Sequence, residues 1–163
     1  MAAGDLWPTL RFREMLMDGT VTLDWDSATI HLLLAKASLT AYVDNTHLAD
    51  LGYLGSVTAE IVEVDGADTG KLIPSLSVTL SSSFVLLKGG PVTFSSTSSG
   101  GGTARFGLLV RMTGTENTSP IIAILDLGAD RALTGASNST PLTVSWTDNK
   151  VIKFSGTGTP ALG

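Results

Sequence analysis

The sequence predicts an all-β protein: an antiparallel β-sandwich of jelly-roll type with one short N-terminal α-helix. Apolar and polar residues alternate with a period of two in several short segments, which is typical of half-buried strands. Turn-forming residues separate these segments at short intervals. Only one segment has the period of a helix, so helices do not alternate with strands as a parallel α/β sheet requires.

The single predicted helix covers residues 8–18, PTLRFREMLMD. Phe12, Met15 and Leu16 recur at helical spacing and form an apolar face. Pro8 suits the first helical turn, and Gly19 suits the left-handed residue that ends a helix. We expect the apolar face of this helix to contact another surface.

The period changes to two directly after the helix. Val21, Leu23 and Trp25 alternate with polar residues and predict a half-buried strand. Residues 28–37 (ATIHLLLAKA) then form a continuous apolar run. Such a run predicts a strand that is buried on both faces.

The middle of the chain is more polar. Residues 46–51 are compatible with one helical turn capped by Asn45, and residues 56–64 return to the spacing of a strand. Residues 72–80 (LIPSLSVTL) alternate well. Pro74 places the start of that segment at a sheet edge or outside the ladder, because proline has no backbone N–H to donate.

The C-terminal half contains the remaining predicted strands. Residues 104–112 and 120–127 predict central strands, joined by the polar turn between them. The shorter strands are predicted in pairs around a Gly-Gly or polar turn: 84–87 with 92–94, and 142–146 with 151–154.

The length of 163 residues fits one domain of ordinary size. We expect an N-terminal arm and helix at residues 1–19, the β-sandwich at residues 20–156 and a C-terminal tail at residues 157–163. Charged residues make up only 15% of the chain, against a usual fraction of about 25%. Neutral polar groups must therefore cover the surface, and the chain has 21 Thr and 17 Ser.

Composition also argues against several classes of function. The net charge of −5 does not suit a protein that binds nucleic acid through phosphate contacts. The apolar runs are far shorter than the roughly 20 residues that span a bilayer. The chain has no cysteine and no dense set of carboxylates, so we expect no metal site and no cofactor.

The sequence predicts no catalytic site. His31 lies in an apolar run and His47 in a polar segment, and neither is near a nucleophile motif. Residues 66–71 (GADTGK) resemble a phosphate-binding loop only superficially, because three residues separate the glycines where four are needed. We therefore expect a protein that is not an enzyme.

Low charge and terminal extensions suit burial in a symmetric assembly. The candidate docking residues are Trp7, Phe12, Met15 and Leu16, because an arm helix has no core of its own to cover its apolar face. Two alternatives stay open: the helix caps the sandwich of its own chain, or the protein is a monomer with frayed termini.

Two charged residues on the predicted central strands are further interface candidates. Arg111 and Asp126 could form an ion pair across strands or between subunits. Solvated charges at a strand edge are the alternative.

Several strings of the sequence follow one another in a recognisable order. A short helix and glycine (FREMLMDG, residues 12–19) precede a strand region (VTLDWDSATIHLLLAK, residues 21–36). Later come ARFGLLVRM (104–112), SPIIAILDLG (119–128) and a final segment with tryptophan (142–154). This order resembles a group of tailed-bacteriophage virion proteins, variously described as head decoration, head-fibre or tail-associated proteins.

The resemblance implies a structural role and brings no catalytic residues. It predicts a decoration, or cement, protein that binds the major capsid protein on the outer surface of the capsid, after synthesis in the host cytoplasm. It also implies a homo-oligomer, most simply a trimer. The alternative is a fibre or tail-tip protein that binds the host surface.

Overall fold

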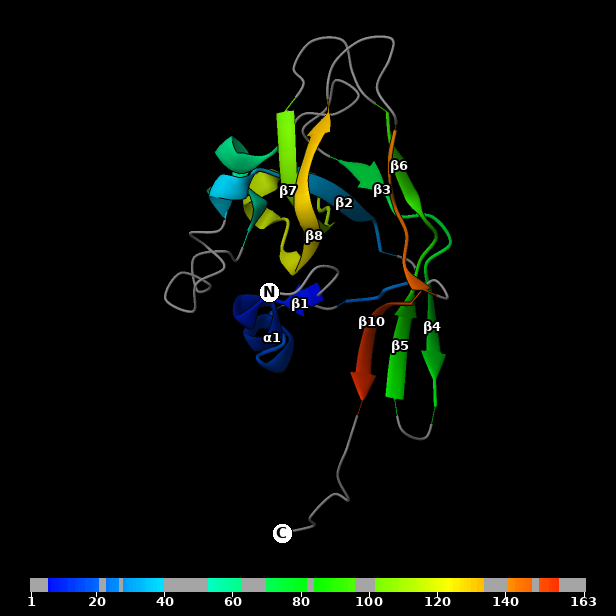
Figure 1. Cartoon of the computed structure of the whole chain (residues 1–163). Coiled ribbons are helices and arrows are strands. Elements are labelled where there is room, and N and C mark those ends of the chain that lie inside the picture. Colours follow the sequence, from blue (N-terminus) through cyan, green and yellow to red (C-terminus); the bar gives the residue numbers. More distant parts are fainter. Residues whose placement is uncertain are drawn as a thin grey trace.

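The fold is mostly β, with antiparallel sheets and one short helix (Figure 1). A computed structural model describes residues 6–20, 23–26, 28–39, 53–62, 70–81, 84–95, 102–133, 141–147 and 150–155. In chain order the helix and strands are β1 (Leu6–Pro8), α1 (Leu10–Met17), β2 (Ile30–Ala35), β3 (Lys71–Leu72), β4 (Ser77–Leu80), β5 (Phe84–Lys88), β6 (Val92–Phe94), β7 (Gly102–Arg111), β8 (Ile121–Leu133), β9 (Leu142–Val144) and β10 (Lys150–Ser155). Short 3-10 helices are η1 (Ala37–Leu39), η2 (Leu54–Ser56), η3 (Thr58–Glu60) and η4 (Glu116–Thr118).

The larger sheet has five strands in the order β1-β8-β7-β2-β3. At its centre, β7 and β8 form an antiparallel hairpin in which Leu108 lies opposite Ile124. β2 lies on the other side of β7, with Leu33 opposite Leu108. The predictions of a strand within residues 28–37 and of two central strands joined by a polar turn are confirmed.

Both faces of the five-stranded sheet are buried. Side chains that alternate along β2 enter two different core clusters. Leu32 and Leu34 belong to the cluster shared with the second β layer. Leu33 and Ala35 belong to the cluster covered by η1, η2 and the segment that follows them. Burial on two sides explains why these strands are continuous apolar runs and do not alternate.

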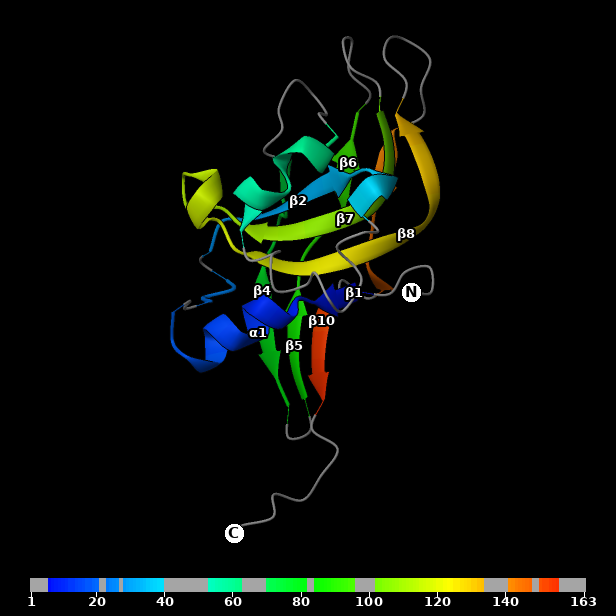
Figure 2. The ribbon, with the colours of Figure 1, turned by 90° about the vertical axis from the view of Figure 1, so that its left-hand side faces the viewer.

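The second layer is a long antiparallel ribbon with one added strand. β6 pairs with β9, β5 pairs with β10, and β4 lies beside β5. The ribbon therefore consists of residues 84–94 running against residues 142–155. Its lower part, made of β4, β5 and β10, extends below the five-stranded sheet in Figure 1. Figure 2 shows α1 passing in front of this lower part.

The two short hairpins expected in this region are wrong. Neither predicted hairpin forms, because β5 pairs with β10 and not with β6, and β9 pairs with β6 and not with β10. A Cβ atom on Gly89 would lie 2.6 Å from Cγ2 of Ile73. Glycine is therefore needed there for close packing against Ile73 rather than for a tight turn.

Helix α1 confirms the predicted N-terminal helix, but Pro8 lies in β1 and not in the first helical turn. Thr9 is its N-cap: the Thr9 hydroxyl accepts a hydrogen bond from the backbone N–H of Phe12 at 3.1 Å. The same hydroxyl donates to the carbonyl oxygen of Ile121 at 2.9 Å, which attaches the helix to the start of β8. Gly19 follows the helix with φ of 75°, the left-handed conformation expected for it.

The strand predicted around Trp25 is wrong in the part that the structure describes. Leu23 and Asp24 have no regular structure, and Trp25 lies in a turn. The Trp25 side chain is 2% exposed, and its Nε1–H donates to the carbonyl oxygen of Lys88 at 2.8 Å. The apolar pattern therefore reflects a connection anchored in the core between the layers, not a ladder of strand hydrogen bonds.

The strand predicted for residues 56–64 is also wrong where it is described. The chain there forms η2 and η3. Val57, between them, and Ile61, directly after η3, are buried against the five-stranded sheet. Val57 and Ile61 are four positions apart, a spacing that places two side chains on one face in a strand as well as in a helix, so the apolar pattern did not distinguish the two. The jelly roll is not confirmed, because the strand pairings leave separate sheets that do not close. The helical turn predicted at residues 46–51 and the tail at residues 157–163 lie outside the described residues.

Candidate interaction surfaces

The structure places the predicted docking residues of α1 on different sides of the helix. Phe12 and Met15 are 1% and 0% exposed and belong to the core between the two layers. The prediction that Phe12 and Met15 dock onto another protein is therefore wrong. They fit the alternative, in which the helix caps the sandwich of its own chain. Leu16 is 39% exposed. Trp7 has a backbone position in β1, opposite Ile124, while its side chain lies outside the described residues.

The outer face of α1 carries an apolar surface that sequence reasoning missed. Leu10 and Met17 are 45% and 91% exposed, and Arg13 and Glu14 lie between them. These positions are spaced i, i+3, i+4 and i+7, so they share one face of the helix. The same spacing is present in the sequence, but Phe12 and Met15 form a second apolar stripe, and periodicity does not say which stripe is buried. Only the tertiary contacts show which stripe is covered.

A second exposed apolar surface lies on β4. Val78 and Leu80 are 45% and 78% exposed. They point to the same face of the small sheet as Leu87 of β5, which is buried. The apolar face of this sheet is therefore covered at its inner end and open at its outer end, where the small sheet projects below the five-stranded sheet (Figure 1).

The expected pairing of Arg111 with Asp126 within one chain is wrong. Asp126 is 2% exposed and pairs with Arg105, whose Nη2 lies 3.1 Å from the carboxylate. The Asp126 Oδ1 atom also accepts the backbone N–H of Gly128 at 2.7 Å. Arg111 lies at the opposite end of β7, where its backbone N–H donates to the carbonyl oxygen of Pro120. The register of β7 and β8 thus separates the two residues along the sheet.

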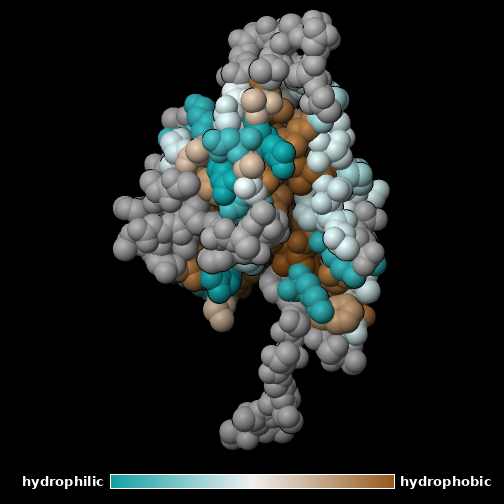
Figure 3. Space-filling model, in the orientation of Figure 1, coloured by the Kyte–Doolittle hydropathy of each residue, from teal (hydrophilic) through white to brown (hydrophobic). Residues whose placement is uncertain are grey.

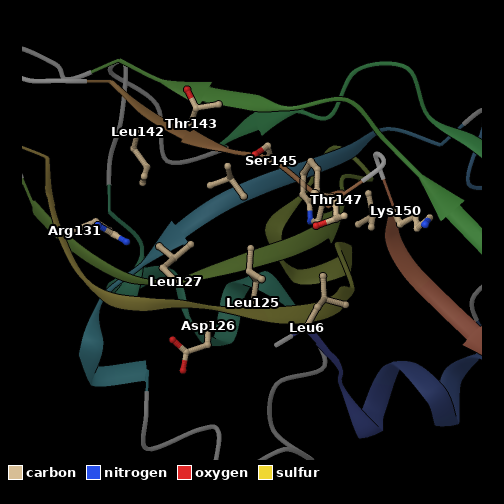
Figure 4. A pocket seen from close by; sticks show the side chains of 13 residues that line it. Leu6, Leu125, Asp126, Leu127, Arg131, Leu142, Thr143, Ser145, Thr147 and Lys150 are labelled. Carbon is tan, nitrogen blue, oxygen red and sulfur yellow. The ribbon is translucent and has the colours of Figure 1, made fainter. Parts of the chain in front are cut away.

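A groove of about 490 Å³ opens between the two β layers. It lies along the side where β1 and β8 of the larger sheet face β9 and β10 of the ribbon (Figure 4). The space-filling view shows apolar surface between two flanks on this side of the molecule (Figure 3). The lining residues are Leu6, Leu125, Asp126, Leu127, Arg131, Leu142, Thr143, Val144, Ser145, Trp146, Thr147, Lys150 and Val151.

The groove has an apolar floor, while six of its thirteen lining residues are polar or charged. Leu125 belongs to the core cluster between the layers, and Leu127 and Leu142 pack against it. The indole Nε1–H of Trp146 is buried and has no hydrogen-bond acceptor among the described residues. Arg131 and Lys150 lie toward opposite ends of the groove in Figure 4.

The described residues offer no arrangement for metal binding: no three of their histidines and carboxylates come together as a possible ligand set. No helix in the described part of the chain is long and apolar enough to cross a membrane. Three candidate interaction surfaces are thus defined among the described residues: the outer face of α1, the outer end of β4 and the groove.

No protein-family model, no curated protein and no solved structure matches this chain.

Proposed function

We propose that the chain is a non-enzymatic structural protein of a tailed-phage virion, a decoration protein that binds the major capsid protein on the outer capsid surface. The observation that carries the proposal is the number of apolar side chains at the surface, on α1, on β4 and in the groove, in a chain with only 15% charged residues. Apolar patches of this kind mark surfaces that other proteins cover. The sequence resemblance supplies the kind of partner.

The mechanism follows from mass action. A protein that binds the assembled shell and not its separated subunits stabilises the shell, by an amount that grows with its concentration relative to its dissociation constant. Exposed apolar side chains on a surface with few charged residues suit such binding, because little charge has to be desolvated. We further propose that the protein acts as a trimer, and its mass in solution tests this.

The experiment is co-sedimentation with emptied capsids of the phage that encodes the chain. The wild-type protein should pellet with the capsids, and the double variant L10E/M17E should stay in the supernatant. Leu72→Glu is the matched control, because Leu72 is 55% exposed on β3 and belongs to none of the three surfaces. Failure of the wild-type protein to pellet would overturn the proposal.

Antibody labelling of intact virions separates the two candidate positions. Label on the head supports the decoration protein. Label on the tail or its fibres would overturn it in favour of the alternative, a fibre or tail-tip protein that binds the host surface. The jelly-roll topology also stays a proposal, and a structure of the assembled protein tests it by showing whether a neighbouring strand joins the separate sheets.

A further inference from the structure

We infer that strand β4 pairs edge to edge, in antiparallel fashion, with β4 of a second copy of this chain. β4 is the last strand of its sheet, and β5 is its single strand neighbour among the described residues. In Figure 1 it forms the outer side of the part of the small sheet that projects below the larger one. An open edge of this kind is a template on which another strand can form backbone hydrogen bonds.

The backbone groups of Val78 and Leu80 point toward this open edge. At the end of the β4–β5 pair, the N–H of Ser81 donates to the carbonyl oxygen of Phe84 at 2.9 Å. In an antiparallel pair every second residue bonds to the neighbouring strand, so Thr79 faces β5 in the same way as Ser81. Val78 and Leu80 occupy the alternate positions, and their N–H and carbonyl groups therefore point away from β5.

Charge favours a second copy as the partner of this edge. Residues 72–87 contain no charged residue, whereas the whole chain has a net charge of −5. Two copies repel each other through their net charge, but β4 can meet β4 without like charges directly opposite each other. The edge is therefore a place where two copies can approach closely.

The other strands at sheet edges have features that oppose such pairing. β1 ends in Pro8, which has no N–H to donate, β3 has only two residues, and β10 carries the exposed Lys153. β6 and β9 have three residues each and directly follow Pro91 and Pro141. β4 has four residues, Ser77–Leu80, with neither a charge nor a proline among them.

One register of the two strands matches apolar with apolar and hydroxyl with hydroxyl. Thr79 lies at the two-fold axis, opposite Thr79 of the second copy, and Val78 lies opposite Leu80 of the second copy. Each Val78–Leu80 pair exchanges two hydrogen bonds, because both residues direct their backbone groups outward. The Val78 and Leu80 side chains, which are 45% and 78% exposed in one chain, then contact each other across the axis.

This contact is separate from the proposed trimer. An antiparallel pair of identical strands has two-fold symmetry, so it cannot by itself close a ring of three. Pairing through β4 joins two single chains, or two trimers that form through another surface. The tests below use no capsids, so the inference and the decoration proposal can fail independently.

Single-cysteine variants test the register, because the chain has no cysteine of its own. In Thr79→Cys the two Cα atoms lie about 4.5 Å apart across the axis, a distance that a disulfide can span. Ser81→Cys is the matched control, because its two copies lie about 14 Å apart along the strands.

Both variants are oxidised mildly at the same protein concentration, and the linked dimer is measured on a denaturing gel. T79C should form it about tenfold faster than S81C, or more, because pairing raises the effective concentration of the two thiols. Equal rates for the two variants, or no dimer from T79C, would overturn the inference.

Amide hydrogen exchange, followed by NMR, tests the hydrogen bonds without any cysteine. Exchange of the Val78 and Leu80 N–H groups should slow as the concentration of the wild-type protein rises. Thr79→Lys places two like charges opposite each other and should abolish this dependence. Thr103→Lys makes the same change at an exposed position of β7 and should behave as the wild type. Exchange that does not depend on concentration, or a dependence that T79K leaves unchanged, would contradict pairing through β4.

Discussion

Arg105 and Asp126 form an ion pair between neighbouring strands of the five-stranded sheet, and the two side chains are buried to different degrees. Asp126 is 2% exposed, while the Arg105 side chain is 25% exposed. Removing Arg105 should therefore have a different cost in stability from removing Asp126. A carboxylate left in the interior loses its compensating charge, whereas a guanidinium near the surface can still be hydrated.

This asymmetry predicts unequal costs for two substitutions. Arg105→Met should lower the free energy of unfolding by about 3 kcal/mol, because the buried carboxylate loses its cation. Asp126→Asn should cost only about 1 kcal/mol, because the amide oxygen can still accept the Gly128 N–H. Urea unfolding of both variants measures the difference. Equal costs would contradict the assignment of the buried charge to Asp126.

The two apolar stripes of α1 should respond differently to truncation. Phe12→Ala should cost about 3–5 kcal/mol, because the Phe12 side chain is 1% exposed and its removal leaves a cavity in the core. Met17→Ala should change stability by less than about 0.5 kcal/mol, because Met17 is 91% exposed. Thermal unfolding followed by circular dichroism compares the two. A stable Phe12→Ala variant would show that α1 does not cap the sheet.

Thr9 makes two hydrogen bonds through one hydroxyl group, and both should be lost in Thr9→Val. The helix then loses its N-cap, and the carbonyl oxygen of Ile121 loses a donor. We expect a loss of about 2 kcal/mol in the free energy of unfolding. Thr9→Ser keeps the hydroxyl and should retain most of the stability. If serine and valine behave alike in chemical denaturation, the capping bond contributes nothing.

Gly128 has φ of 82° and lies in β8 directly beyond the Asp126 pair. Gly128→Ala should destabilise the protein by about 1–2 kcal/mol, because L-residues with a Cβ are strained in this region. Gly128→Asn should cost less, since asparagine tolerates left-handed conformations. The order of midpoints in a urea titration checks this. An alanine variant as stable as the wild type would require a different backbone at this position.

The pKa of Asp18 lies below its ordinary value, because the Thr20 side chain and the Thr20 backbone N–H both donate to its carboxylate. The folded state therefore gains stability from Asp18 above the ordinary pKa of an aspartate, and loses it as the pH falls through the lowered value. Thr20→Ala should raise the pKa toward its ordinary value. A carboxyl NMR titration of both proteins measures this, and identical titration curves would contradict the hydrogen bond from the side chain.

The sequence was informative where one local rule decided the structure. The helix could be predicted because its cap, its period and its terminating glycine all act within a few residues, and the positive φ of Gly19 follows from that position. The central strands could be predicted because burial on both faces requires long apolar runs such as residues 28–37. Local patterns were misleading where glycines between two strands do not reverse the chain, as at Gly89 between β5 and β6.

Composition and local periodicity were enough to predict a mostly β chain with one N-terminal helix. Packing between distant segments sets which stripe of α1 is buried, which cation meets Asp126, and where the two layers leave a groove with an apolar floor. Periodicity states which residues share a face, but it does not state what covers that face. That choice depends on contacts between residues far apart in the chain, such as Thr9 with Ile121 and Trp25 with Lys88.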